Sequence, residues 1–273
     1  NGLHGRTKLG MSLTGLSFWR ADPAPVGGIT HVISPYCYRC PLGLSNNSCE
    51  LECALEVDKA IRTSTSGRVA AFIAEPVQGN GGIITPPPGY FERGKEILDR
   101  HGILFISDEV QTGYGRTGRM FGCQHWDIQP DIITSAKALA NGTPLGAFST
   151  TDSIAASFTR ASASTLGGNP VSSVAALATL DVIANEDLVA KAEAMGSLLK
   201  KRLQELKEEH PAIGEVRGKG LMLGAELVAK DKSPATEETD RVLESLKNMG
   251  VLAGKTGAGR NVLTFQPPLI IEE

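Results

Sequence analysis

The stretch Ile103-Leu-Phe-Ile-Ser-Asp-Glu-Val-Gln-Thr-Gly113 sets the expected fold. It begins as a near-continuous apolar run of strand length, which is typical of a strand covered on both faces of a parallel sheet. The run ends in two carboxylates, Asp108 and Glu109, and a glycine-rich loop follows. In open α/β sheets the ligand lies outside the carboxyl ends of the strands. Asp108 is therefore predicted to lie at a ligand site.

Similar apolar runs occur on both sides of this stretch. Val69–Glu75, Asp131–Ser135 and Leu145–Thr150 are predicted strands, and Tyr90–Arg100 is a predicted helix that ends at a glycine-containing stop. Alternation of short buried strands with helices predicts an α/β fold with a mostly parallel central sheet. We assign residues 1–185 to this large domain.

The pattern changes after residue 185, where a long charged helix with an apolar stripe begins. Strand-like and helical stretches then follow one another without the long crossovers of a parallel sheet. Residues 186–273 are therefore predicted to form a smaller C-terminal α+β domain. The elements predicted around and after the boundary are helices at 170–183, 188–209 and 236–249, and strands at 221–228, 251–252 and 262–265.

A single lysine follows the third predicted strand, in Asp131-Ile-Ile-Thr-Ser-Ala-Lys137. Burial disfavours an ammonium group, lowers its pKa and leaves a nucleophilic amine that can form an imine. Most lysines at strand ends are ordinary surface residues, so Lys137 alone decides nothing. Together with Asp108 it forms the minimum set for pyridoxal phosphate chemistry, in which a carboxylate keeps the ring nitrogen protonated. A metal site at Asp108 and Glu109 is a weaker alternative, because neighbouring residues on a strand point to opposite faces.

The motifs around these residues resemble those of class III, pyridoxal-phosphate-dependent aminotransferases, over nearly the whole chain. Within the class the resemblance is greatest to the alanine–glyoxylate branch and its relatives, which include the amino-alcohol phosphate lyases. The order of the motifs and the 29-residue step from Asp108 to Lys137 carry the resemblance. The motifs are His4-Gly-Arg-Thr7, Glu75-Pro-Val-Gln-Gly79, Ser107-Asp-Glu-Val-Gln-Thr-Gly113, Ala136-Lys-Ala-Leu-Ala-Asn-Gly142, Thr165-Leu-Gly-Gly-Asn-Pro170 and Val216-Arg-Gly-Lys-Gly220.

The resemblance implies a cofactor, pyridoxal 5'-phosphate, and a role for each matching residue. Lys137 would be the Schiff-base lysine and would carry the proton during the reaction. Asp108 would pair with the pyridine nitrogen, Val110 would pack against one face of the ring, and Gln111 would reach the ring hydroxyl. Glu75 would lie at a strand end near the site in a supporting role. Without the resemblance, Val110 could be an ordinary core valine, and Gln111 could be a polar loop residue that hydrogen-bonds to the backbone.

The resemblance also implies a homodimer. Thr165 would bind the cofactor phosphate of the neighbouring subunit, so each active site would need two chains. The alternative for Thr165 is a loop hydroxyl that hydrogen-bonds to nearby backbone.

Four departures from the family pattern bear on binding. Members usually carry a longer N-terminal part with a phosphate-binding loop and a further C-terminal helix, so we expect the chain to be truncated at both ends. Leu3 stands where an aromatic residue usually stacks on the ring. Thr264 stands where many members have an arginine that grips the substrate carboxylate. Arg260 is a candidate replacement for that arginine.

Three functions remain open at this stage. The first is a transaminase that moves an amino group from an amino acid or ω-amine donor to a 2-oxo acid in a ping-pong cycle. The second keeps the cofactor and Lys137 but eliminates phosphate from an amino-alcohol phosphate. The third is an inactive fragment that acts as a binding module. The departures from the family pattern are the reason to consider it.

Composition narrows the partners. The chain has 273 residues and a net charge of −3, and it has no basic stripe of the kind that indicates nucleic-acid binding. No apolar run reaches the ~18–20 residues that a membrane-spanning helix needs. Small-molecule substrates and a cytoplasmic location are therefore expected.

The cysteine spacing Cys37-x-x-Cys40 and Cys49-x-x-x-Cys53 raises the question of zinc or disulfides. Cys49 and Cys53 fall in a stretch with helical character, whereas structural zinc ligands usually lie on tight turns. There are five cysteines, an odd number, and the resemblance is to a cytosolic class. Reduced thiols and no metal are therefore the expectation.

Overall fold

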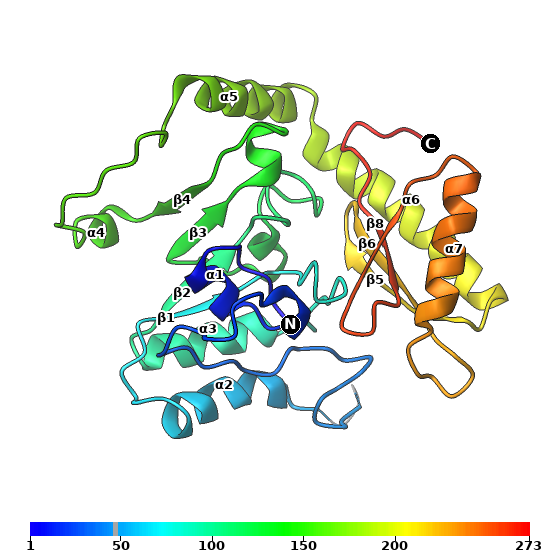
Figure 1. Ribbon diagram of the computed structural model, residues 1–273, viewed down its shortest axis with the longest axis horizontal. Coiled ribbons are helices and arrows are strands. Elements are labelled where there is room, and N and C mark those ends of the chain that lie inside the picture. Colours follow the sequence, from blue (N-terminus) through cyan, green and yellow to red (C-terminus); the bar gives the residue numbers. More distant parts are fainter. Residues whose placement is uncertain (46–48) are drawn as a thin grey trace.

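The computed structural model describes residues 1–45 and 49–273, which form two β-sheets with helices packed on them (Figure 1). The first sheet has the order β1-β2-β3-β4, in which β1, β2 and β3 are parallel and β4 is antiparallel to β3. This arrangement confirms the prediction of a mostly parallel α/β sheet. Its strands are β1 (Ala71–Ala74), β2 (Leu104–Asp108), β3 (Ile132–Ser135) and β4 (Ala147–Thr150).

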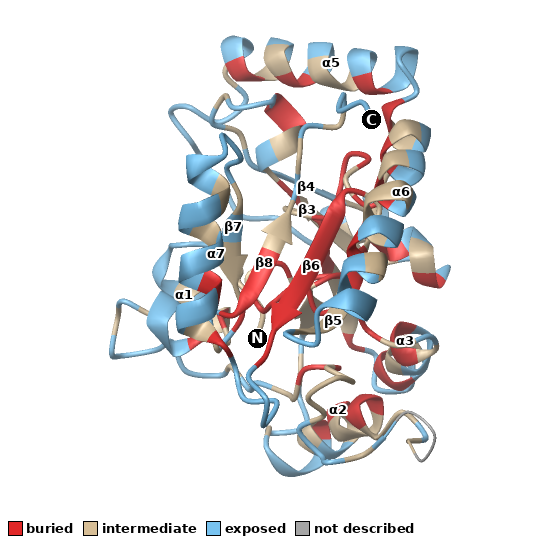
Figure 2. Ribbon diagram, turned by 90° about the vertical axis from the view of Figure 1, so that its right-hand side faces the viewer, coloured by how far each residue is buried: buried red, intermediate tan, exposed pale blue. Residues whose placement is uncertain are grey.

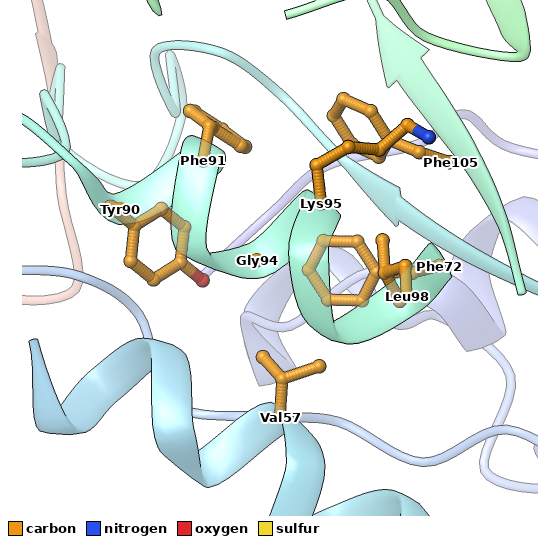
Figure 3. A pocket seen from close by; sticks show the side chains of 8 residues that line it. All are labelled: Val57, Phe72, Tyr90, Phe91, Gly94, Lys95, Leu98 and Phe105. Atoms are coloured by element: carbon orange, nitrogen blue, oxygen red, sulfur yellow. The ribbon is translucent and has the colours of Figure 1, made fainter. Parts of the chain in front are cut away.

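The core of this sheet lies under two helices, α2 (Glu52–Thr63) and α3 (Tyr90–Arg100). Figure 3 shows a small pocket between them, where Val57 of α2 faces Tyr90 and Leu98 of α3. The pocket is apolar apart from Tyr90 and Lys95, so we interpret it as a packing gap in the core. The bounds of α3 are those predicted from its amphipathic pattern. The residues lining the pocket are Val57, Phe72, Tyr90, Phe91, Gly94, Lys95, Leu98 and Phe105.

Helix α5 (Pro170–Asn185) begins as the sequence indicates. The Asn169 side chain accepts a hydrogen bond from the Ser172 N–H at 3.0 Å, and Pro170 occupies the first turn, where its missing N–H costs nothing. Helix α6 (Leu188–Glu209) follows after two residues. The domain boundary proposed at residue 185 therefore lies in the connection between two helices.

The second sheet is antiparallel and has the order β5-β6-β8-β7. Helices α6 and α7 (Thr236–Asn248) pack against it, and Figure 2 shows that its strand β6 is buried along its whole length. This is the smaller α+β unit expected for the C-terminal part. Its strands are β5 (Ile213–Lys219), β6 (Met222–Leu227), β7 (Gly254–Thr256) and β8 (Val262–Phe265).

Two local predictions were wrong. Val251 and Leu252 were predicted to form a strand, but they lie in an exposed turn, and Leu252 is 90% exposed. Cys49 was assigned to the same helix as Cys53, but α2 begins only at Glu52. The remaining elements are short: α1 (Lys8–Leu13), α4 (Asp152–Ala155), and the 3₁₀ turns η1 (Ser17–Trp19), η2 (Gly122–Trp126) and η3 (Lys137–Ala140).

A buried ion-pair network joins the segment before α2 to the second sheet. Glu226 on β6 is 1% exposed, and its carboxylate accepts hydrogen bonds from Arg217 at 2.7 Å and from Arg39 and Tyr36. Burial alone would raise the pKa of Glu226. The Tyr36 hydroxyl and the two guanidinium groups outweigh burial, so the pKa of Glu226 lies below its usual value.

Replacing Glu226 with alanine is expected to lower the free energy of unfolding by roughly 3–5 kcal/mol, because Arg217, Arg39 and Tyr36 would lose their shared buried acceptor, although Glu215 would remain beside Arg217. Because the folded pKa is depressed, the wild-type contribution is present at neutral pH and is lost as the pH falls through that folded pKa. Urea unfolding at pH 7 measures the change. Glu244→Ala, in an exposed pair with Lys247, is the matched control. Equal losses in the two variants would contradict the assignment.

Candidate functional site

Three polar side chains form a row at the carboxyl ends of β1, β2 and β3. Asp108 is in register with Thr134, and Glu75 directly follows Ala74, which is in register with Ser107. Residues in register on neighbouring parallel strands point to the same face, and adjacent strands lie about 4.8 Å apart. We call Glu75, Asp108 and Thr134 the strand-end row.

Both oxygens of Asp108 are engaged. Its Oδ2 lies 2.7 Å from Nδ1 of His4, and both side chains are only 5% exposed. Its Oδ1 accepts a hydrogen bond from the Val110 N–H at 3.1 Å. The carboxylate is therefore held in one orientation by a residue far away in the sequence. No role was predicted for His4 from the sequence, although His4 lies in the motif His4–Thr7.

Glu109 serves the opposite side of β2. Its carboxylate accepts hydrogen bonds from the backbone N–H groups of Gly122 at 2.8 Å and Cys123 at 2.9 Å, and from the hydroxyls of Ser107 and Thr112. Glu109 thus holds the following loop in place and does not join Asp108. In the described part of the chain, no group of three His, Cys, Asp or Glu side chains could hold a metal ion.

Lys137 is the first residue of η3, two residues after β3 ends. Its φ of 47° lies in the left-handed region, which is uncommon for a residue with a side chain and costs about 1–3 kcal/mol. The turn is held by a hydrogen bond from the Leu139 N–H to the Ala136 carbonyl and by packing of Leu139 and Ala140 in the same cluster as Ala176 of α5. Such strain persists where the surrounding structure fixes it, often at functional sites.

The amine of Lys137 lies in the electrostatic field of the strand-end row. Taken as a whole residue, Lys137 is exposed, but the surrounding protein partly buries its amine. This partial burial lowers the pKa of the ammonium group. The carboxylates of Glu75 and Asp108 act in the opposite direction. Lys137 therefore interacts electrostatically with Asp108 and Glu75, and the catalytic roles of the three residues stay predictions.

Gln111 and Gly79 meet at the edge of the row. A Cβ atom on Gly79 would lie 2.5 Å from the Gln111 carboxamide, so the carboxamide would have to move if a larger residue replaced Gly79. Val110 is half-buried beside Gln111. Two buried polar atoms in this region, Oγ1 of Thr134 and Oε1 of Gln78, have no hydrogen-bond partner within the described part of the chain. Both atoms are therefore free to bind a polar ligand or water.

A broad groove borders this region. It has a volume of about 1400 Å³, and His4, Glu75 and Gln78 form part of its lining. Most of the lining comes from residues 28–41 and 57–74, and Asp108, Gln111 and Lys137 do not line it. The groove is therefore a hollow that meets the site only at its edge.

Thr165 lies apart from the row. It belongs to the exposed connection between α4 and α5, at the edge of the molecule in Figure 1, and the hydrogen bonds of the row do not include it. Within one chain the structure therefore does not bring Thr165 to Lys137. Its role in a neighbouring subunit stays a prediction.

Arg260 lies in the turn between β7 and β8, where it is exposed and has a φ of 49°. This hairpin contacts the edge of the site, since Thr256 Oγ1 and the Gly257 N–H both donate to the Asn80 carbonyl, at 2.7 and 3.2 Å. Thr264 pairs within the sheet, opposite Gly224 and Gly254. A role for Arg260 in carboxylate binding stays a prediction.

The family model described as aminotransferase class-III matches residues 1–273. The chain belongs to the class-III aminotransferase family. Among curated relatives of this class-III chain, alanine–glyoxylate aminotransferase 2 homolog 2 of Arabidopsis thaliana is 43% identical over 98% of the chain. A leucine/methionine racemase of Thermococcus litoralis is 43% identical over 99% of the chain. The acetylornithine aminotransferase of Mycobacterium leprae is 39% identical over 99% of the chain.

Solved structures agree with this membership. A Bacillus anthracis aminotransferase superposes with a TM-score of 0.90 at 38% identity and covers 100% of the class-III chain. The chain spans only 56%, 62% and 59% of the three curated relatives and 64% of the B. anthracis protein. It thus corresponds to less than two thirds of each of them.

Replacing His4 with glutamine is expected to lower turnover about ten- to hundredfold, because Asp108 would lose a charge-assisted hydrogen bond. Attachment of the cofactor to Lys137 should persist. Steady-state kinetics and the absorption of the bound cofactor measure the two effects. His210→Gln, at an exposed histidine after α6, is the control. Wild-type turnover in His4→Gln would remove His4 from the site.

Proposed function

We propose that the protein is a pyridoxal-phosphate-dependent aminotransferase that transfers an amino group from an amino acid or ω-amine to a 2-oxo acid. The observation that supports this proposal is the fixed carboxylate of Asp108, which His4 and the Val110 N–H hold in one orientation and which interacts electrostatically with the Lys137 amine. A nucleophilic amine and a fixed carboxylate are the two groups that this chemistry demands.

The residues of the site fit the proposed cofactor. Lys137 would bind it covalently, Asp108 would contact its ring nitrogen, and Val110 and Gln111 would border the ring. The unpaired hydroxyl of Thr134 offers one further polar contact. When bound, the cofactor supplies an electron sink for the carbanion formed at the substrate Cα.

The protein groups then have separate tasks. Asp108 would stabilise a proton on the ring nitrogen, and the hydrogen bond to His4 holds the Asp108 carboxylate in one orientation. The Lys137 amine would accept the proton that the substrate Cα loses and would donate it again later in the reaction. Its lowered pKa places more of the amine in the proton-accepting form at neutral pH than an exposed lysine would have.

A half-reaction tests the proposal. The loaded protein is mixed with an amine donor and no acceptor, and the 2-oxo product is quantified. One equivalent of 2-oxo product per site supports transamination. Inversion of the donor without oxo product would make the protein a racemase, as the name of the T. litoralis relative suggests for that protein. Phosphate release from an amino-alcohol phosphate would favour the lyase, and no reaction with any substrate would favour the binding module.

The proposal includes a homodimer with shared active sites. Large apolar side chains on β4, on the α4–α5 connection and on α5 are exposed, including Phe148 at 73%, Leu166 at 76% and Val174 at 63%. Large apolar side chains that are exposed in this number support a protein interface. Leu166, one of them, directly follows Thr165, the residue proposed to reach the neighbouring site. Sedimentation equilibrium measures the oligomeric state.

A cytoplasmic location is also proposed. The cysteines Cys37, Cys40, Cys49, Cys53 and Cys123 are all free, as a reducing compartment requires. Among the described residues, no helix has the length and apolar character to cross a membrane. Cell fractionation would locate the protein.

A further inference from the structure

Glu75 is the one member of the strand-end row whose contacts the proposed reaction does not explain. It is 3% exposed, and its two carboxylate oxygens bind different segments. Oε1 accepts a hydrogen bond from the Leu3 N–H at 2.8 Å, and Oε2 accepts one from the Gly79 N–H at 2.9 Å. A single buried carboxylate therefore holds two stretches that are 76 residues apart.

The first contact holds the segment that carries His4, the hydrogen-bond partner of Asp108. Leu3 directly precedes His4, whose ring binds the Asp108 carboxylate. The segment is otherwise tied down by a hydrogen bond from the His4 N–H to Thr14 Oγ1 at 3.2 Å and by one from the Gly15 N–H to the Gly2 carbonyl at 2.8 Å. The bond to Glu75 links this segment to the end of β1, and the contact between His4 and Asp108 links it to the end of β2.

The second contact holds the turn that lies beside Gln111. Gly79 begins this tight turn, in which the N–H groups of Gly82 and Ile83 both donate to the Gly79 carbonyl at 3.1 Å. The Cα of Gly79 lies against the carboxamide at the end of the Gln111 side chain. A shift of Gly79 away from Glu75 would therefore change the space available to that carboxamide.

The charged groups around Glu75 are compatible with an ionised carboxylate that holds two neighbouring segments in place. His4 and the backbone N–H groups of Leu3 and Gly79 favour the charged form, while burial and Asp108 favour the neutral form and raise the pKa overall. The other charged groups nearby are the amines of Lys137 and Asn1. Each N–H group donates to a different oxygen of Glu75. The ionised carboxylate has two equivalent acceptor oxygens, which suits this pair of donors.

We propose that Glu75 is a positioning residue that fixes the His4–Asp108 pair and the Gln111 carboxamide relative to each other, and so orients the cofactor ring between them. This inference rests on the proposed function for its reference to the cofactor. The clamp between Leu3, Glu75 and Gly79 belongs to the chain alone and is testable without any ligand.

The test compares wild type, Glu75→Gln and Glu75→Asp. Glutamine has nearly the same shape, but its amide NH₂ would face one of the two N–H donors, so one contact is lost. In the ligand-free protein, ¹⁵N-histidine NMR reports the His4 ring. With pyridoxal phosphate added, circular dichroism of the bound cofactor, borohydride trapping on Lys137 and kinetics follow. Glu92→Gln, at an exposed position on α3, is the control.

The expected result for Glu75→Gln is a displaced His4 signal, at least twofold weaker cofactor dichroism, retained trapping on Lys137, and kcat about tenfold lower with little change in KM. Unchanged His4 signals together with unchanged dichroism would overturn the proposal. If Glu75→Gln does not fold, Glu75→Asp decides: it keeps both acceptors but is one methylene shorter, and the same changes are expected. Absence of trapping in the wild type would contradict the proposed function, while the ligand-free His4 signal would still test the clamp.

Discussion

Lys137→Ala is expected to abolish covalent attachment of pyridoxal phosphate and to remove amino transfer. In the proposed function, the Lys137 side chain supplies both the amine that binds the cofactor and the base that moves the proton. Among the described lysines whose pKa is shifted, Lys137 interacts with Glu75 and Asp108, whereas Lys200 does not. Borohydride reduction followed by mass spectrometry of the peptide around residue 137 measures attachment. Release of 2-oxo product measures turnover.

Lys200→Ala is the matched control for this variant. Burial also lowers the pKa of Lys200, but its amine donates to the Gly218 carbonyl at 3.1 Å on the second sheet, away from the row. Cofactor attachment should be unchanged in this control. A reduced adduct on a different lysine in Lys137→Ala, with turnover retained, would refute the assignment. Because the pKa of Lys137 is lowered, wild-type attachment should also begin at a lower pH than modification of an exposed lysine.

Asp108→Asn is expected to leave attachment at Lys137 in place and to lower turnover by about two to three orders of magnitude. Asparagine has a similar shape but carries no charge, so the proton on the ring nitrogen would lose its stabilising partner. The His4 ring would also lose its charged acceptor. Kinetics and the absorption maximum of the bound cofactor measure the two consequences.

Asp99→Asn serves as the control, because Asp99 lies at the exposed end of α3 and pairs with Lys95 on the same helix. Turnover of this variant should equal that of the wild type. If Asp108→Asn also retained full turnover, the role of Asp108 at the ring nitrogen would be wrong. If it lost attachment as well, Asp108 would act chiefly in building the site.

The elements with strong local patterns could be predicted from the sequence. Helices α3 and α6 begin and end where the apolar stripe and its flanking stop signals place them. Strand β5 was not predicted, because Gly214, Gly218 and the charged residues between them hide the alternation of a strand. It forms because β6 and α6 cover it, which is a tertiary effect.

The same distinction applies to the site. Glu75, Asp108 and Lys137 could be found because each follows an apolar strand, and parallel strands end at one edge of the sheet. The contact between His4 and Asp108 spans 104 residues and leaves no local pattern. Its only signal was the position of His4 in a family motif. Thr165 could be named from the resemblance but not placed, because one chain alone leaves it exposed.

The turn at residues 79–82 belongs to the first domain in the sequence, but Arg217 of β5 grips it by two hydrogen bonds to the Gly82 carbonyl, at 2.9 and 2.6 Å. Thr256 of β7 holds the same turn through Asn80. In mechanical terms the turn moves with the C-terminal sheet. Any rotation of that sheet must either carry one wall of the site with it or break these bonds, so the width of the site and the angle between the sheets change together.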